Sequence, residues 1–227
     1  MPDKHSNSRR EFLQKMIALT ALAGVAPYAD AFGQPFAEIR KGKLPLRPLG
    51  KTGHMVSIYS LGGQGFIEIP GKEDISVEII NRALDLGINY IDTAAAYGRQ
   101  TPTVARADAM GTSERNMGQV MKYRRKEVFL ASKTHDRTYD GSMRLLEKSL
   151  MQLNTDHLDL WQIHNVRMAE METLDRITGE GGVLKAMIKA RDEKMIRFIG
   201  FSGHEGPDVL NALNERFPFD NVLVAIN

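Results

Sequence analysis

The amino-acid sequence predicts an α/β fold built on a parallel sheet. Short apolar runs alternate with longer segments in which apolar residues recur at helical spacing, from about residue 56 to residue 226. Such alternation is typical of parallel strands joined by right-handed helical crossovers. No linker or low-complexity tract interrupts it, so we expect one domain over residues 32–227.

The composition excludes several classes of function. With 42% hydrophobic and 26% charged residues, the chain has an ordinary globular composition. A net charge of +2 gives no electrostatic reason to expect nucleic acid or an anionic membrane as a partner. The absence of cysteine excludes thiolate catalysis, disulfides, iron–sulfur ligation and cysteine-based zinc sites.

Residues 1–31 have the features of a secretory signal. Arg9 and Arg10 precede Phe-Leu and a short apolar run, and Ala29-Asp30-Ala31 offers a small-x-small cleavage site. The arginine pair resembles the twin-arginine motif, and the run is too short to span a membrane. We therefore expect a twin-arginine signal peptide, the export machinery as a partner, a periplasmic location and no membrane anchor after cleavage. A basic amphipathic surface helix is the alternative.

The expected elements follow in order along residues 32–227. A hairpin turning at residues 50–53 leads into the first core strand, which ends before a glycine-rich turn at residues 62–65. That turn lacks the spacing of a dinucleotide fingerprint, which favours a barrel over an open doubly wound sheet. Beyond it, the periodicity predicts helices over 74–86, 113–121, 141–153, 183–193 and 209–216, and strands over 88–92, 128–133, 158–164, 198–202 and 222–226. Asp74 is a candidate cap of the first of these helices, and Gly87 is expected to end it.

Titratable side chains stand at the ends of these strands. Asp92 ends the strand of INYIDTAAAYG, Tyr97 follows one turn later, and Lys133 and His164 end the next two strands. In a parallel barrel these ends share one edge, where active sites are placed. A lysine beside a phenol favours phenolate, so Tyr97 is a candidate general acid toward a carbonyl oxygen, with His164 orienting the substrate or assisting proton transfer. The plainer alternatives are a helix N-cap, a packing tyrosine, a solvated lysine and a structural histidine.

Seven pieces of the sequence resemble one enzyme family, the aldo/keto reductases. The match runs from about residue 46 to residue 227, and its pieces are RPLGKTG, SLGG, INYIDTAAAYG, GTSERNMG, the ASK strand end, DHLDLWQIHN and IRFIGFSGH. The resemblance implies a TIM-type (β/α)8 barrel, of which this chain contains about six of eight βα units. It also implies reversible hydride transfer between NADPH, or less often NADH, and an aldehyde or ketone, with Asp92, Tyr97, Lys133 and His164 as the catalytic tetrad.

The resemblance also suggests the cofactor contacts Gly63, Gln64, Asp92, Ser202 and Gly203. At the last of these the family often has an amide, so carboxamide anchoring would rest on the serine or on another group. The sequence stops after the sixth expected strand, whereas such barrels run to about 250 residues. We therefore expect an N-terminal fragment without most of the phosphate-binding loops, which leaves NADP or NAD open. The polar segment 99–110 is a candidate part of the substrate mouth.

Other functions remain open at this stage. His135, His164 and His204 follow three consecutive strands near Asp92, as the ligands of a metal-dependent barrel hydrolase or isomerase would. That hypothesis leaves the tyrosine and the lysine unused, so we expect no metal. A serine hydrolase fits less well, because GFSGH lacks the second glycine of a nucleophile elbow. A non-catalytic protein that senses the cofactor or serves as an auxiliary binding subunit is the remaining alternative.

Overall fold

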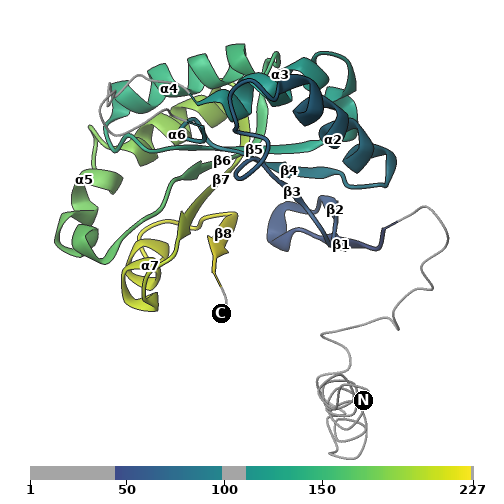
Figure 1. Ribbon diagram of the computed structural model, residues 1–227. Helices are drawn as coiled ribbons and strands as arrows, with labels where there is room; N and C mark the ends of the chain where they lie inside the picture. Colours follow the sequence, from purple (N-terminus) through teal and green to yellow (C-terminus); the bar gives the residue numbers. More distant parts are fainter. Residues whose placement is uncertain (1–43, 99–110, 226–227) are drawn as a thin grey trace, which may run out of the picture. The chain divides into compact units, whose positions relative to one another are not determined.

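The computed structural model describes residues 44–98 and 111–225, which form a curled parallel sheet covered by helices (Figure 1). The predicted signal peptide and the segment 99–110 lie outside the described residues. In the described ranges, no helix is both long enough and apolar enough to cross a membrane.

The six-stranded sheet has the order β3-β4-β5-β6-β7-β8, and every pairing in it is parallel. Sequence neighbours are therefore neighbours in space, as in a barrel, whereas the strand order of a doubly wound sheet reverses direction. The predicted alternation is confirmed, and the curled sheet corresponds to part of a barrel. The strands are β3 (Leu61–Gly62), β4 (Tyr90–Asp92), β5 (Phe129–Thr134), β6 (Leu158–Ile163), β7 (Ile196–Gly203) and β8 (Asn221–Val224).

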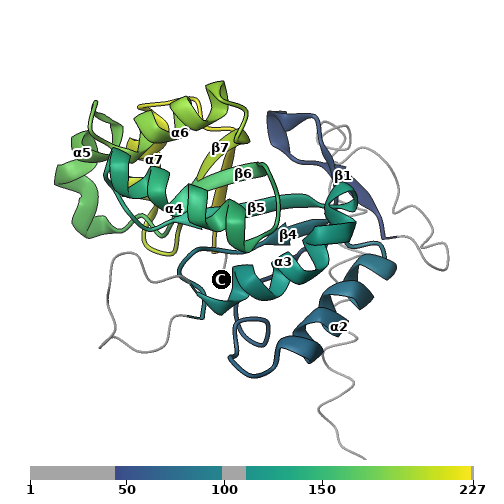
Figure 2. The same ribbon diagram turned by 90° about the horizontal axis from the view of Figure 1, so that it is seen from above.

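Helices fill the connections between these strands, and α2, α3, α4 and α6 lie together on one face of the sheet (Figures 1 and 2). The longer helices are α2 (Glu73–Asp85), α3 (Thr112–Arg124), α4 (Tyr139–Gln152), α6 (Val183–Asp192) and α7 (Pro207–Asn214). Shorter ones are η3 (Arg125–Glu127), η4 (Met168–Thr173) and α5 (Leu174–Thr178).

Helix α2 corrects one detail of the sequence analysis. Its N-cap position is Lys72, which makes no side-chain capping bond, so Asp74 is not a cap and lies in the first turn. A carboxylate there still stabilises the helix through the positive end of its dipole. At the other end Gly87 has φ of 93° and donates its N–H to the Leu84 carbonyl at 2.9 Å, so the glycine ends the helix as predicted.

Strand β5 is buried on both faces, which places its side chains alternately in two cores. Phe129 and Ala131 belong to an inner cluster with Val56. Leu130 belongs to the large cluster beneath the helices. Lys133 is the next alternate residue after Phe129 and Ala131, so its side chain also lies on the inner face, near the carboxyl end of the strand.

The predicted hairpin is β1 (Leu46–Pro48) with β2 (Met55–Ser57), joined through η1 (Gly50–Thr52). Asn89, just before β4, fixes it to the sheet. The Asn89 Oδ1 accepts from the Ser57 N–H at 2.7 Å, and its Nδ2 donates to the Met55 carbonyl at 3.0 Å. The hairpin thus supplies Val56 to the inner cluster.

A second buried carboxylate, Asp159, lies at the amino end of β6. Its Oδ2 accepts from Arg125 at 2.8 Å and from the Leu130 N–H at 2.9 Å, and its Oδ1 accepts from Arg197 at 2.8 Å. The side chain is 4% exposed, so a carboxylate here needs these partners. The cluster ties η3, β5, β6 and β7 together at the end of the sheet away from Lys133.

Candidate active site

The centre of the site is a buried ion pair between neighbouring strands. Asp92 is the last residue of β4, and Lys133 lies near the end of β5. The Lys133 Nζ donates to Asp92 Oδ2 and, at 2.9 Å, to the Thr93 carbonyl. Because this lysine is only 1% exposed, its charge needs a counter-charge, which Asp92 provides. Asp92 is therefore the ion-pair partner of Lys133.

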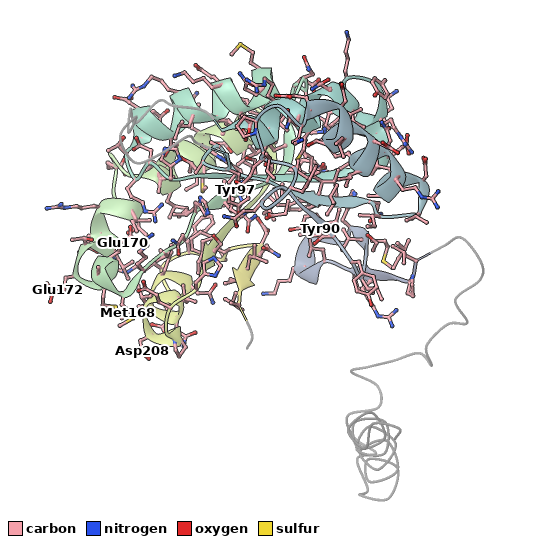
Figure 3. The ribbon with its side chains drawn as sticks, in the orientation of Figure 1. Tyr90, Tyr97, Met168, Glu170, Glu172 and Asp208 are labelled. Atoms are coloured by element: carbon pink, nitrogen blue, oxygen red, sulfur yellow. The ribbon has the colours of Figure 1, made fainter. Side chains whose placement is uncertain are left out.

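Tyr97 lies against the same ammonium group. The Lys133 Nζ donates to the Tyr97 Oη at 3.0 Å and lies 4.7 Å from the centroid of its ring. The turn that carries the tyrosine depends on Gly98, which has φ of +82°. A Cβ at Gly98 would lie 2.2 Å from Thr112 Oγ1, so a larger residue would displace the start of α3 or the tyrosine. In Figure 3, Tyr97 lies near the middle of the ribbon.

His164 follows β6 directly and completes the group of four. Its backbone N–H donates to the Thr134 carbonyl at 2.9 Å, and its ring meets the Tyr97 ring edge-on, with 5.5 Å between centroids. Burial lowers the pKa of His164 to about 3, and the charge of Lys133 adds to the effect. The imidazole is therefore neutral at physiological pH. The structure brings Asp92, Tyr97, Lys133 and His164 together.

Gln162 is a member of this cluster that the sequence analysis missed. It pairs with Lys133 across the β5–β6 register, and its Nε2 donates to Asp92 Oδ1 at 2.9 Å. The side chain is fully buried, and its Oε1 has no hydrogen-bond partner among the described residues. Its position two residues before His164 was the available signal, because alternate residues of a strand share a face.

The GTSERNMG piece places the start of α3 against the glycine-rich turn. The Ser113 hydroxyl donates to the Gly63 carbonyl at 2.8 Å and contacts the Thr93 hydroxyl at 2.9 Å. Gly63 also donates its N–H to the Asp92 carbonyl at 2.8 Å. A Cβ at Gly63 would lie 2.5 Å from the Ser113 Oγ, so the glycine allows this close approach. These bonds connect β3, β4 and α3 beside the ion pair.

Glu114, in the same piece, is a fully buried carboxyl group outside the site. It accepts from the Ser132 hydroxyl at 2.5 Å and from the Ser149 hydroxyl at 3.1 Å. Burial raises the pKa of Glu114 to about 7, against the opposing effects of both hydroxyls and of the Lys133 charge. Through its two hydrogen bonds the Glu114 carboxyl group joins α3 to β5 and α4, and Ser132 directly precedes Lys133 in the sequence.

The suggested cofactor residues lie at the carboxyl ends of two strands. Gly63 and Gln64 follow β3, whereas Ser202 and Gly203 end β7, and β4, β5 and β6 lie between these strands. The Ser202 hydroxyl accepts from the Asn165 N–H at 2.9 Å, so it keeps its own proton as a donor. These residues share an edge of the sheet with the tetrad.

Gly203 has a packing reason to lack a side chain. A Cβ there would lie 2.4 Å from the Leu210 Cδ2 and 3.1 Å from the Val166 carbonyl oxygen. Leu210 of α7 is buried in the large cluster. An amide side chain at position 203 would therefore require the buried Leu210 side chain to move.

The structure does not favour the metal hypothesis. Across residues 44–98 and 111–225, no three or more histidine, aspartate or glutamate side chains are grouped so as to hold a metal ion. His135, His164 and His204 thus form no such site in the part of the chain that the structure describes.

Comparison with known proteins agrees with this geometry. The sequence profile of the aldo/keto reductase family matches residues 60–227, which is most of the chain. The chain belongs to the aldo/keto reductase family. This chain is 31% identical over 173 residues to the L-galactose dehydrogenase of Arabidopsis thaliana, covering 71% of this chain and 49% of that protein. The chain spans about half the length of the curated relatives it matches.

Solved aldo/keto reductases share the fold of this family member. One from Pseudomonas aeruginosa is 30% identical with a TM-score of 0.61, covering 79% of this chain and 66% of that one. One from Klebsiella pneumoniae, solved with NADP and acetate, is 25% identical with a TM-score of 0.56, covering 73% of this chain and 52% of that one.

Proposed function

We propose that this chain carries the catalytic groups of a nicotinamide-dependent reductase that interconverts an aldehyde or ketone with its alcohol. One observation carries the proposal: the buried Lys133 Nζ bonds the Tyr97 Oη at 3.0 Å while it is paired with Asp92. This arrangement prepares a phenol to release a proton next to a fixed positive charge.

Tyr97 is the proton donor to the carbonyl oxygen in this proposal. As the phenol loses its proton, the Lys133 ammonium stabilises the phenolate that remains, through the hydrogen bond it already donates. Asp92 holds the ammonium in place and balances its charge. The lysine thus changes the stability of the phenolate without itself reaching the substrate.

His164 orients the carbonyl group. Because burial keeps its imidazole neutral, with a pKa of about 3, the ring offers a hydrogen bond without acting as a second strong acid. The edge-on contact with the Tyr97 ring sets the two rings at 82° to each other. A carbonyl oxygen between them would meet both side chains.

The cofactor would supply the hydride when bound. Gly63, Gln64, Asp92, Ser202 and Gly203 are the proposed contacts, and the spare Ser202 proton suits the carboxamide oxygen of a nicotinamide. The NADP complex of the Klebsiella pneumoniae relative supports NADP, with NAD as the alternative.

The test is NADPH-dependent reduction of aldehydes by the protein, compared with Tyr97→Phe. We expect kcat to fall by about 10²- to 10⁴-fold in the variant, the usual contribution of a general acid, while NADPH affinity measured by fluorescence stays the same. A variant that retains wild-type kcat would contradict the role of Tyr97. NADPH binding without any carbonyl reduction would favour the cofactor-sensing alternative.

We also propose that residues 1–31 direct the protein to the periplasm by the twin-arginine route. The support is the Arg9-Arg10 pair with the small-x-small site at residues 29–31. Replacing both arginines by lysine should retain the protein in the cytoplasm, and the mature N-terminus of the exported form should follow Ala31. Continued export of the double-lysine variant would refute this route.

A further inference from the structure

A pocket of about 300 Å³ opens beside the tetrad, on the side of η4. His164 forms one wall, so the pocket begins next to the Tyr97 ring that this histidine meets. Tyr97 and Glu170 lie on different elements, with Glu170 carried by η4 (Figure 3). We call this the arginine pocket, and its polar lining residues are His135, Arg137, His164, Asn165, Arg167 and Glu170.

Arg137 is fixed in the wall and its charge is balanced. Its Nε donates to Glu170 Oε1 at 2.6 Å, and its Nη2 donates to Glu170 Oε2 at 3.1 Å and to the His164 carbonyl at 2.9 Å. Burial acts to raise the pKa of Glu170, but the bonds and charge of Arg137 outweigh it, and the Arg167 backbone N–H, which donates to Glu170 Oε2 at 3.0 Å, and the charge of Arg167 add to the lowering, so the pKa lies below its ordinary value. The carboxylate of Glu170 is therefore ionised and is used to balance Arg137.

Arg167 is the second cation of the wall, and it is exposed. Within the described residues its guanidinium has no carboxylate at ion-pair distance. It lies 3.1 and 3.2 Å from the side-chain amide of Asn165, whose oxygen accepts both bonds when the amide is correctly oriented. Two arginines and one glutamate leave the pocket wall with one unbalanced positive charge.

The nearby groups do not cancel this charge. The neutral His164 contributes none, and positive charge from Lys133, His135, Arg137 and His204 adds to the burial that lowers its pKa. Glu205 lies near η4, where it accepts from the Met168 N–H at 2.6 Å, but it does not line the pocket. An apolar substrate would leave the Arg167 charge without a partner as it covered the pocket.

We propose that the arginine pocket binds a carboxylate at the far end of the carbonyl substrate, so that the enzyme acts on short oxo acids. The inference rests on the proposed function for the carbonyl end, which the tetrad would hold. A guanidinium matches a carboxylate with two parallel hydrogen bonds, and Asn165 fixes the plane of Arg167 from one side. The volume suits a small ligand of this kind.

The first experiment compares succinate semialdehyde with its methyl ester, which differ in the terminal charge. For the wild-type protein we expect kcat/KM to be at least about tenfold higher for the acid, the typical value of a charged hydrogen bond. Arg167→Met should lower this acid-to-ester ratio about tenfold. Arg176→Met is the matched control, because it removes the same charge from an exposed site on α5 outside the pocket, and it should leave the ratio unchanged.

Three results would overturn the inference: equal kcat/KM for acid and ester, a ratio unchanged in Arg167→Met, or the same fall in Arg176→Met. A purely structural role of Arg167 would lower both rates together and leave the ratio unchanged. A second measurement needs no turnover: succinate should bind the wild-type protein, with about tenfold weaker affinity in Arg167→Met by calorimetry. If succinate binds in this way but no aldehyde is reduced, the carboxylate site is supported and the proposed reductase function is refuted. Equal succinate affinity in both proteins overturns the pocket even if reduction occurs.

Discussion

The two ends of the sheet each contain a buried aspartate, and their partners differ. At the amino end, Asp159 accepts hydrogen bonds from two arginines and a backbone N–H. At the carboxyl end, the Asp92 carboxylate is held by Lys133 and Gln162, and the lysine passes its influence to the Tyr97 hydroxyl. A buried aspartate thus serves stability at the amino end. At the carboxyl end it can support proton transfer, because only there does the partner of the aspartate, Lys133, also donate to a phenol.

The largest expected effect comes from Asp92→Asn. The variant removes the carboxylate that balances the buried Lys133 ammonium and holds it beside Tyr97. We expect kcat for carbonyl reduction to fall by about 10³-fold, within the range of proton-transfer catalysis. Steady-state kinetics on folded protein, verified by circular dichroism, measures it. If Asp92→Asn keeps nearly wild-type kcat, Asp92 has no more part in the reaction than Asp159 has.

The matched variant Asp159→Asn should damage stability and leave chemistry intact. The amide of asparagine would turn an N–H group toward the arginine or backbone N–H donors that now bond Asp159. It would also remove the counter-charge of Arg125, which is partly buried. Breaking such a pair costs about 3 kcal/mol. Urea unfolding should show the loss, while kcat of the folded protein stays within about twofold of wild type. A selective loss of kcat would mean that the amino end also serves the reaction.

Glu114 offers a third buried carboxyl group, and its pH dependence sharpens the comparison. Since its pKa is raised to about 7 in the folded protein, the folded state keeps a proton that the unfolded state releases above about pH 4.5. Its contribution to stability is therefore fully present below about pH 4.5 and falls as the pH rises through 7. The total loss is on the order of 3 kcal/mol.

Glu114→Gln should flatten this dependence, because the amide keeps partners for Ser132 and Ser149 without ionising. At pH 8 we expect the variant to be more stable than wild type by about 2 kcal/mol in urea unfolding. Glu147→Gln, at an exposed position of α4, is the control and should follow the wild-type curve. Parallel curves for wild type and Glu114→Gln would contradict the raised pKa.

The smallest expected effect is that of Gln162→Met. Methionine fills a similar volume but removes the donor to Asp92 Oδ1, which costs about 1 kcal/mol. We expect kcat to fall about three- to tenfold and its pH profile to shift, with NADPH affinity unchanged. Gln152→Met, at the end of α4, is the control. If the pH profile of kcat is that of the wild type in both Gln162→Met and Gln152→Met, the role of Gln162 is packing alone.

The elements were predictable because their signals are local. Helical spacing of apolar residues predicted the ends of the five longer helices within a few residues. The short apolar run that begins at Phe129 predicted the strand that the structure has there. The Asp74 cap was wrong because the helix begins earlier, with Lys72 at the N-cap position, and that position depends on the backbone angles of one residue. The strand-end positions of Asp92, Lys133 and His164 were visible for the same local reason.

The sequence by itself therefore determined the alternation of elements, the parallel sheet and the edge at which its titratable residues gather. Only the tertiary structure decided which groups touch. Gln162 reaches Asp92 across 70 residues of chain, and Glu114 meets Ser149 across 35, through strand register and helix packing. Local patterns decide which face a side chain takes, because that depends on backbone geometry alone. Partners and pKa values depend on burial and on charges brought together from distant segments, and these arise only when the sheet is assembled.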